Sequence, residues 1–157
     1  MFYLILFYVL RSMFYVPGSS YRSPVPGPRL SVMIMGTGVD IVEVARFQRF
    51  VDEQNEALLN RLFTPAERDY CRPRKACAQH YAARFAAKEA FVKALGMGIR
   101  EGIGWQDVEV THDSLDKPLF RFTPVAQERL RERNVIRSHL SLSHDGGMAL
   151  AMVILES

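Results

Sequence analysis

The sequence has few of the features that mark several classes of protein. Its 157 residues include only two cysteines, and the spacing of Cys71 and Cys77 matches no common zinc-binding pattern. We therefore expect free thiols in a reducing compartment rather than a disulfide-stabilised scaffold. The apolar run at residues 1–10 is about half the roughly 20 residues that a membrane-spanning helix needs. It also lacks the preceding positive charge and the small-residue cleavage site of a secretory signal.

The chain has almost no excess of charge of either sign outside its N-terminal segment. Residues 1–32 contain three arginines and no acidic residue, which leaves 17 basic and 17 acidic residues in residues 33–157. A domain that is formally neutral does not coat nucleic acid as a polycation. An acidic partner would therefore have to be bound by a local basic patch.

Residues 1–32 differ in composition from the rest of the chain. The apolar run is followed by PGSSYRSPVPGPR, which is rich in Pro, Gly and Ser and cannot bury enough apolar surface to order itself. Met33 and Met35 stand directly before an ordered pattern. We expect residues 1–32 to be a disordered extension upstream of the true start, or alternatively a weak membrane anchor. Residues 33–157 are expected to form one domain.

The remaining sequence predicts an α+β domain in which a long helix packs on a mostly antiparallel sheet. Apolar runs and alternating patterns predict strands at residues 32–42, 106–112, 119–122, 139–144 and 148–155. Helical spacing predicts helices from residue 44 onward, from Thr64 to before Pro73, from about Lys75 to Leu95, and from Thr123 to near Asn134. Thr64 and Glu67 are placed for a capping box, and Gly96 for a left-handed helix end.

Two acidic residues stand where apolar residues are expected. Glu89 lies on an apolar stripe of the long helix, and Asp40 lies between Val39 and Ile41 at the first strand. A buried carboxylate is costly unless it is paired or holds a metal. Together the two would form a site for Mg²⁺, which takes one or two protein carboxylates and substrate phosphates. The alternatives are an ion pair of Glu89 with Lys93 and a helix N-cap role for Asp40.

Three segments carry a family resemblance. GTGVDIVEVARF at residues 36–47 and RFAAKEAFVKALG at residues 84–96 resemble the two signature segments of the short bacterial 4′-phosphopantetheinyl transferases. LSLSH at residues 140–144 is similar to the C-terminal motif of that family. The resemblance covers roughly Met35 to Leu155 and does not extend to residues 1–32.

The resemblance implies the 4′-phosphopantetheinyl transferase fold and a reaction in fatty acid biosynthesis. The phosphopantetheine arm of coenzyme A passes to a serine of apo-acyl carrier protein, and adenosine 3′,5′-bisphosphate leaves. Attack on a pyrophosphate requires neutralised charge and in-line placement of the nucleophile. The resemblance also implies a cytoplasmic homotrimer with active sites between subunits. Its partners would be coenzyme A and an acidic carrier protein, with no nucleic acid and no membrane.

The same resemblance implies roles for individual residues. Asp40 and Glu89 would hold Mg²⁺ against the pyrophosphate, and Glu89, or a water that it orients, would take the serine proton. Lys93 would neutralise or protonate the leaving phosphate, and Lys88 would contact a phosphate. The alternative for both lysines is a solvated helix face. His144 would contact the nucleotide, or else serve only the structure of its hairpin.

This sequence departs from the longer members of the superfamily at one position. Those proteins often carry another acid two residues after the first, where this chain has Val42. Only two protein carboxylates are then available to a metal ion. Glu43 could contribute only if the first strand ends early.

Arg46 lies inside the first motif and is the candidate contact with the carrier protein. It begins a stretch of seven basic residues with five acids: Arg46, Arg49, Arg61, Arg68, Arg72, Arg74 and Lys75. Rim charges of this kind steer association more than they fix affinity. The alternative is a set of scattered, solvated arginines.

Two other functions fit parts of the pattern. A small Mg²⁺-dependent phosphohydrolase would use the same carboxylates with water as the nucleophile. An RNA-binding module would need exposed aromatic residues among the arginines, whereas Phe47, Phe50 and Phe63 fit apolar helix faces. The sequence suggests no role for His80, His112 or His139, and it places Trp105 in the core.

Overall fold

The computed structural model of the protein describes residues 32–96 and 102–157. The extension expected at residues 1–32 lies outside the described residues, apart from Val32. The elements follow in the order β1 (Ile34–Glu43), α2 (Val44–Asp52), α3 (Glu56–Leu62), α4 (Pro65–Cys71), α5 (Cys77–Leu95), the 3-10 helix η1 (Trp105–Asp107), β2 (Val108–His112), β3 (Pro118–Phe122), α6 (Pro124–Glu132), β4 (Arg137–Asp145) and β5 (Met148–Glu156). This order confirms the predicted α+β class.

The helix expected from residue 44 onward is divided into α2 and α3. Gln54 adopts a left-handed φ of 50°, which ends the first helix. Asn55 then caps α3, because its side chain accepts a hydrogen bond from the backbone N–H of Leu58 at 3.2 Å. The division therefore has a local cause that the apolar spacing did not reveal.

The other predicted helix ends are confirmed. Thr64 and Glu67 form the reciprocal capping box at the start of α4. α5 ends at Gly96, whose φ of 69° is left-handed. Arg133 supports this end by donating to the carbonyl oxygen of Leu95 at 2.9 Å.

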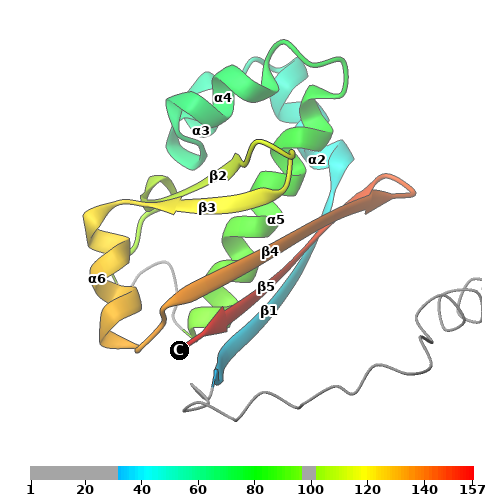
Figure 1. The fold of residues 1–157 in the computed structure, drawn as a ribbon. Coiled ribbons are helices and arrows are strands. Elements are labelled where there is room, and N and C mark those ends of the chain that lie inside the picture. The colour runs from blue at the N-terminus through cyan, green and yellow to red at the C-terminus, as the bar shows by residue number, and fades with distance from the viewer. Residues whose placement is uncertain (1–31, 97–101) are drawn as a thin grey trace, which may run out of the picture. The chain divides into compact units, whose positions relative to one another are not determined.

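α5 is the central element of the fold. Three antiparallel strands in the order β1-β5-β4 form the main sheet, and α5 packs along one of its faces (Figure 1). β2 and β3 form a separate antiparallel hairpin against α5, α2 to α4 gather near the start of the helix, and α6 lies beyond the hairpin (Figure 1). Most of α5 is therefore buried, including the charged side chains of Arg84 and Lys88.

β1 approaches α5 more closely than a residue with a Cβ would permit. A Cβ at Gly38 would lie 1.9 Å from the carbonyl oxygen of Ala90, and one at Gly36 would lie 1.9 Å from that of Ala94. Side chains two residues apart on a strand share a face, so Asp40 also points toward α5. The close contact of Gly36 and Gly38 with the α5 backbone thus sets the distance between Asp40 and the helix.

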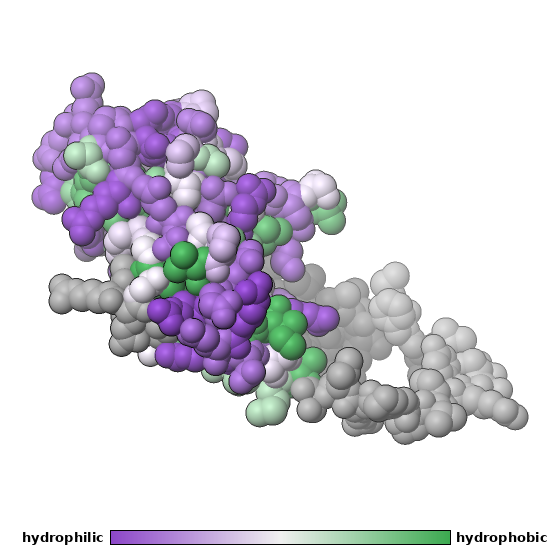
Figure 2. Space-filling view, turned by 90° about the vertical axis from the view of Figure 1, so that its left-hand side faces the viewer, coloured by the Kyte–Doolittle hydropathy of each residue, from purple (hydrophilic) through white to green (hydrophobic). Residues whose placement is uncertain are grey.

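The opposite face of the main sheet is apolar along β1 and β5, and none of the described elements covers it. Val39 and Ile41 on β1 are 51% and 56% exposed, and Met152 on β5 is 42% exposed. In contrast, the side of the molecule on which α6 lies is largely hydrophilic and has only small hydrophobic patches (Figure 2). An exposed apolar face of this kind marks an interaction surface.

Two further findings concern the cysteines and the helices. Cys71 and Cys77 are free thiols, as expected from the sequence. Among residues 32–96 and 102–157, no helix combines the length and the apolar character needed to cross a membrane.

Replacing Gly38 with alanine should lower the stability of the fold by about 1–3 kcal/mol, because the new methyl group must push β1 away from α5. Thr37→Ala is the matched control, since Thr37 is the neighbouring residue on the exposed face of the strand. Thermal denaturation measures both changes. A Gly38→Ala variant that melts together with the wild type would contradict the close packing of strand and helix.

Candidate active site

The two carboxylates singled out in the sequence line the same pocket. Asp40 comes from β1 and Glu89 from α5, and Arg46 of α2 and Phe85 of α5 also line the pocket. Its volume is about 420 Å³. The remaining lining residues are Ile41, Val42 and Glu43. Because β1 and α5 meet through Gly38, residues 49 positions apart in the sequence are brought together here.

Lys93 pairs with Asp40 and not with Glu89. Its Nζ donates to Asp40 Oδ1 at 2.8 Å and to the carbonyl oxygen of Val39 at 3.2 Å. The hydrogen bond to Asp40 raises the pKa of Lys93, so that its side chain stays protonated. The Lys93 side chain is 52% exposed.

Both structural alternatives for the carboxylates are wrong. None of the ion pairs in the described part of the chain includes Glu89, which excludes the expected pair with Lys93. The N-cap residue of α2 is Glu43, so Asp40 does not cap that helix. Neither carboxylate is therefore explained by the role that local structure alone would give it.

Glu89 is half-buried in the wall of the pocket. Burial raises its pKa above the ordinary value of 4.5, and the negative charge of Asp40 raises it further. The positive charges of Lys93 and Arg46 act in the opposite direction. A divalent cation between Asp40 and Glu89 would relieve their mutual repulsion.

The donor set of the pocket matches a hard cation. Within the described ranges, no three His, Cys, Asp or Glu residues are grouped so that they could hold a metal ion. Val42 is buried and offers no ligand, and Glu43 is exposed at the end of β1. Asp40 and Glu89 thus provide two carboxylates, the number that Mg²⁺ commonly takes from a protein while water and phosphate oxygens complete its shell.

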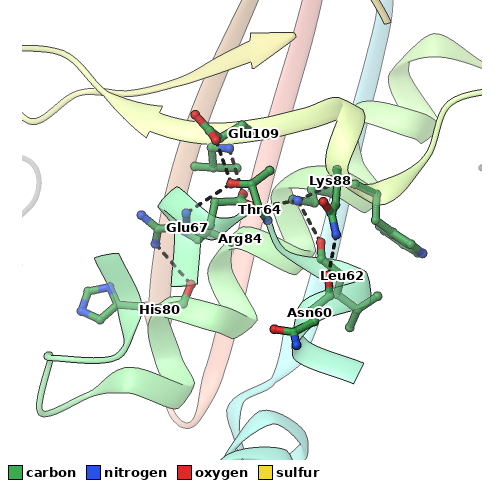
Figure 3. Close-up of polar contacts among 11 residues, drawn as sticks. Asn60, Leu62, Thr64, Glu67, His80, Arg84, Lys88 and Glu109 are labelled. Carbon is green, nitrogen blue, oxygen red and sulfur yellow. Dashed lines mark hydrogen bonds and ion pairs between the residues drawn. The ribbon is translucent and has the colours of Figure 1, made fainter. Parts of the chain in front are cut away.

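Lys88 lies inside the protein and not at the pocket. It is 1% exposed, and its Nζ donates to Glu67 Oε2 at 2.7 Å and to the carbonyl oxygen of Leu62 at 2.9 Å (Figure 3). It also donates to the carbonyl oxygen of Trp105 at 2.7 Å. An ammonium group has three donors, so none remains for a phosphate. This position contradicts both the phosphate contact and the solvated helix face that were expected of Lys88.

Two arginines and two histidines surround Tyr70 in a group that the sequence did not reveal, here called the Tyr70 cluster: Arg74, His80, Arg84 and His112. The guanidinium carbons of Arg74 and Arg84 lie 3.3 and 3.9 Å from the centre of the Tyr70 ring. His80 and His112 pack against the same ring, with centroid distances of 5.6 and 4.9 Å.

Arg84 is the buried centre of the Tyr70 cluster. It is 2% exposed, and its Nη1 donates to the carbonyl oxygen of His80 at 3.3 Å (Figure 3). Its Nε and Nη2 have no hydrogen-bond partner among the described residues. A buried guanidinium group without a carboxylate partner is suited to binding an anion. Arg84 stands inside the second motif, but only the fold shows that it is buried.

The positive charge of the arginines affects the pKa values of the two histidines in the Tyr70 cluster. Burial lowers the pKa of His80, and the charges of Arg84, Arg74, His144 and His112 lower it further. Burial and the charge of Arg84 also lower the pKa of His112. His144 is exposed on β4 and close enough to His80 to affect its titration. Its contact with a nucleotide stays a prediction.

Arg46 lies at the edge of the pocket on an exposed helix. Its guanidinium carbon is 5.3 Å from the centre of the Phe85 ring. Two other members of the basic stretch, Arg49 and Arg72, form ion pairs with nearby glutamates at 4.0 and 2.5 Å. The contact of Arg46 with a carrier protein stays a prediction.

Comparisons with known proteins agree with the resemblance carried by the motifs. Residues 36–153 match the 4′-phosphopantetheinyl transferase superfamily. A holo-(acyl-carrier-protein) synthase of Trichlorobacter lovleyi is 59% identical over 125 residues, covering 80% of this chain and 99% of the relative.

Solved structures show the same fold. The crystal structure of holo-(acyl-carrier-protein) synthase from Neisseria meningitidis has a TM-score of 0.74 and 37% identity, covering 80% of this chain and 100% of that chain. The Helicobacter pylori enzyme in complex with coenzyme A has a TM-score of 0.67 and 30% identity, covering 76% and 98% of the two chains. The fold and the family expected from the motifs are thus confirmed. The chain belongs to the 4′-phosphopantetheinyl transferase superfamily.

Proposed function

We propose that the protein transfers the 4′-phosphopantetheine arm of coenzyme A to a serine of apo-acyl carrier protein. The meeting of Asp40 and Glu89 in one pocket carries the proposal, because each residue lies inside one of the two family motifs. The serine oxygen forms a bond to the phosphorus that carries the pantetheine arm. The bond from that phosphorus to the bridging oxygen breaks, and this oxygen leaves with adenosine 3′,5′-bisphosphate.

Asp40 and Glu89 would hold Mg²⁺ through their carboxylate oxygens. The ion would supply charge neutralisation and polarisation of the pyrophosphate. Glu89, or a water that it orients, would accept the serine proton. Lys93 neutralises the phosphate of the leaving group with its protonated, half-exposed side chain.

The phosphates of coenzyme A have a second binding region in the Tyr70 cluster. Arg84 has two guanidinium nitrogens without a hydrogen-bond partner in the described part of the chain, and Arg74 adds positive charge beside it. His144 lies near this group and would contact the nucleotide, as the C-terminal motif implies. The relative from Helicobacter pylori was solved with coenzyme A bound, which supports a site for this substrate.

The exposed sheet face supports the homotrimer that the resemblance implies. Val39, Ile41 and Met152 form an apolar surface on neighbouring strands, which further copies of the chain would cover. Ile41 also lines the pocket of Asp40 and Glu89. A neighbouring subunit on this face would therefore lie close to the active site.

The function is tested by the intact mass of apo-carrier protein after incubation with coenzyme A, Mg²⁺ and the enzyme. We expect the mass to increase by one phosphopantetheine arm. Glu89→Gln should slow the reaction by about 10²–10⁴-fold, because it removes a metal ligand and the proton acceptor. Glu43→Gln, at the same pocket, is the matched control and should keep the rate. Consumption of coenzyme A with an unmodified carrier would indicate a phosphohydrolase instead.

The raised pKa of Glu89 predicts how Mg²⁺ affinity depends on pH. Mg²⁺ requires the ionised carboxylate, so the apparent affinity should fall as the pH is lowered, starting above the ordinary value of 4.5. Ionised Glu89 also opposes folding, since its folded pKa is the higher one. Glu89→Gln should therefore melt above the wild type at neutral pH, and this difference should vanish below about pH 4.5. Mg²⁺ titrations at several pH values measure the affinity, and melting curves over the same range measure the difference in stability. An affinity and a stability difference that do not change with pH would refute the assignment of Glu89 as a metal ligand.

Arg46→Ala should raise the KM for the carrier protein and weaken the dependence of the rate on salt, because an exposed charge pair is screened. The affinity for coenzyme A should change little. Arg131→Ala is the control, since Arg131 lies outside the basic stretch, on α6, and is paired with Glu128. Loss of coenzyme A binding in Arg46→Ala would show that Arg46 serves the other substrate.

Sedimentation of the full chain tests the assembly. The wild type should sediment as a trimer, and Met152→Asp should reduce its mass, because the substitution places a charge in the apolar sheet face. Leu115→Asp is the control; Leu115 is 87% exposed in the turn between β2 and β3. A monomeric wild type would contradict the proposed interface.

A further inference from the structure

The ammonium group of Lys88 connects three separate parts of the chain to α5. Its acceptors are the last residue of α3, Leu62, the α4 residue Glu67, and the first residue of η1, Trp105. The three donors point to three acceptors at 2.7–2.9 Å, so the side chain is held in one position. Such a complete set of partners indicates a rigid structural connection, here called the Lys88 joint, between α5 and these three segments.

Glu67 completes this joint on the other side. Its Oε1 accepts from the backbone N–H of Val110 at 2.9 Å, and its Oε2 accepts from that of Thr64 at 2.9 Å. Burial lowers the pKa of Lys88, and the charge of Glu67 raises it. Removal of either partner alone would leave a buried charge, which is costly. The pair is therefore kept together by the fold around it.

The Trp105 end of this joint leads back to the active site. The Trp105 ring stacks on Phe85, with a centroid distance of 5.0 Å and an interplanar angle of 28°. Phe85 lies one turn before Glu89 on α5 and lines the same pocket. The guanidinium group of Arg46 lies over the Phe85 ring. A continuous series of contacts thus runs from the Lys88 ammonium to the pocket wall.

We propose that Lys88 is a positioning residue: by holding the Trp105 carbonyl, it keeps the Trp105 ring against Phe85 and so fixes the pocket wall on which Arg46 lies. The proposal rests on the proposed function, because it assumes that Arg46, at the edge of this pocket, contacts the carrier protein. Lys88 then acts on the capture of the carrier and not on the chemical step, although it is the neighbour of Glu89 in the sequence.

Two kinds of variant separate this role from simple stabilisation. Lys88→Met removes the bond to Trp105, and Lys88→Met combined with Glu67→Gln does the same without leaving a buried, unpaired charge. Glu67→Gln alone is the matched control, because it disturbs the ion pair but leaves the Lys88–Trp105 bond. Trp105 is the only tryptophan of the chain, so its emission reports directly on this contact.

We expect both variants without Lys88 to show red-shifted Trp105 emission, about a tenfold higher KM for the carrier protein, and a kcat within about twofold of the wild type. Glu67→Gln should lower the melting temperature and leave emission and KM unchanged. A folded double variant with wild-type emission and KM would overturn the proposal, and so would an equal rise in KM in Glu67→Gln. Absence of transfer by the wild type would refute the proposed function, while the emission spectra would still test the Trp105 contact.

Discussion

The contact between β1 and α5 is the constraint on which the site depends. Gly36 and Gly38 let the strand lie directly against the carbonyl oxygens of Ala94 and Ala90. Any larger side chain would separate the two elements, and with them Asp40 and Glu89. The apolar core of the domain and the geometry of its pocket therefore arise from the same close packing of a strand and a helix.

The helix α5 carries charge in two different environments. Lys88 and Arg84 are enclosed by α4, the β2–β3 hairpin and η1, whereas Lys93 contacts β1 and Glu89 lines the pocket. In the interior the charge of Lys88 is fully hydrogen-bonded and rigid. At the pocket, Glu89 has no direct partner among residues 32–96 and 102–157, and the nearby Lys93 is half exposed, as a site that must accept substrate and metal requires.

The sequence predicted the features that depend on local spacing. The long helix, the capping box of α4 and the two carboxylates could be found because each follows from a period or a short motif. The burial of Lys88 could not be predicted from the sequence. Lys88 and Glu89 are adjacent on the helix but point to different neighbours, and only the fold decides which of the two is buried. The Tyr70 cluster was also hidden, because Arg84 and His112 meet only after α5 and β2 have packed.

Asp40 and Glu89 are proposed to hold one Mg²⁺ ion together. The most direct test is the Mg²⁺ dependence of the transfer rate for Asp40→Asn, Glu89→Gln and the double variant. If both residues bind the same ion, their effects on the transfer rate are not additive. The rate of the double variant should then be about as low as that of the slower single variant. Losses that multiply, or a single variant with wild-type rates at low Mg²⁺, would contradict the account.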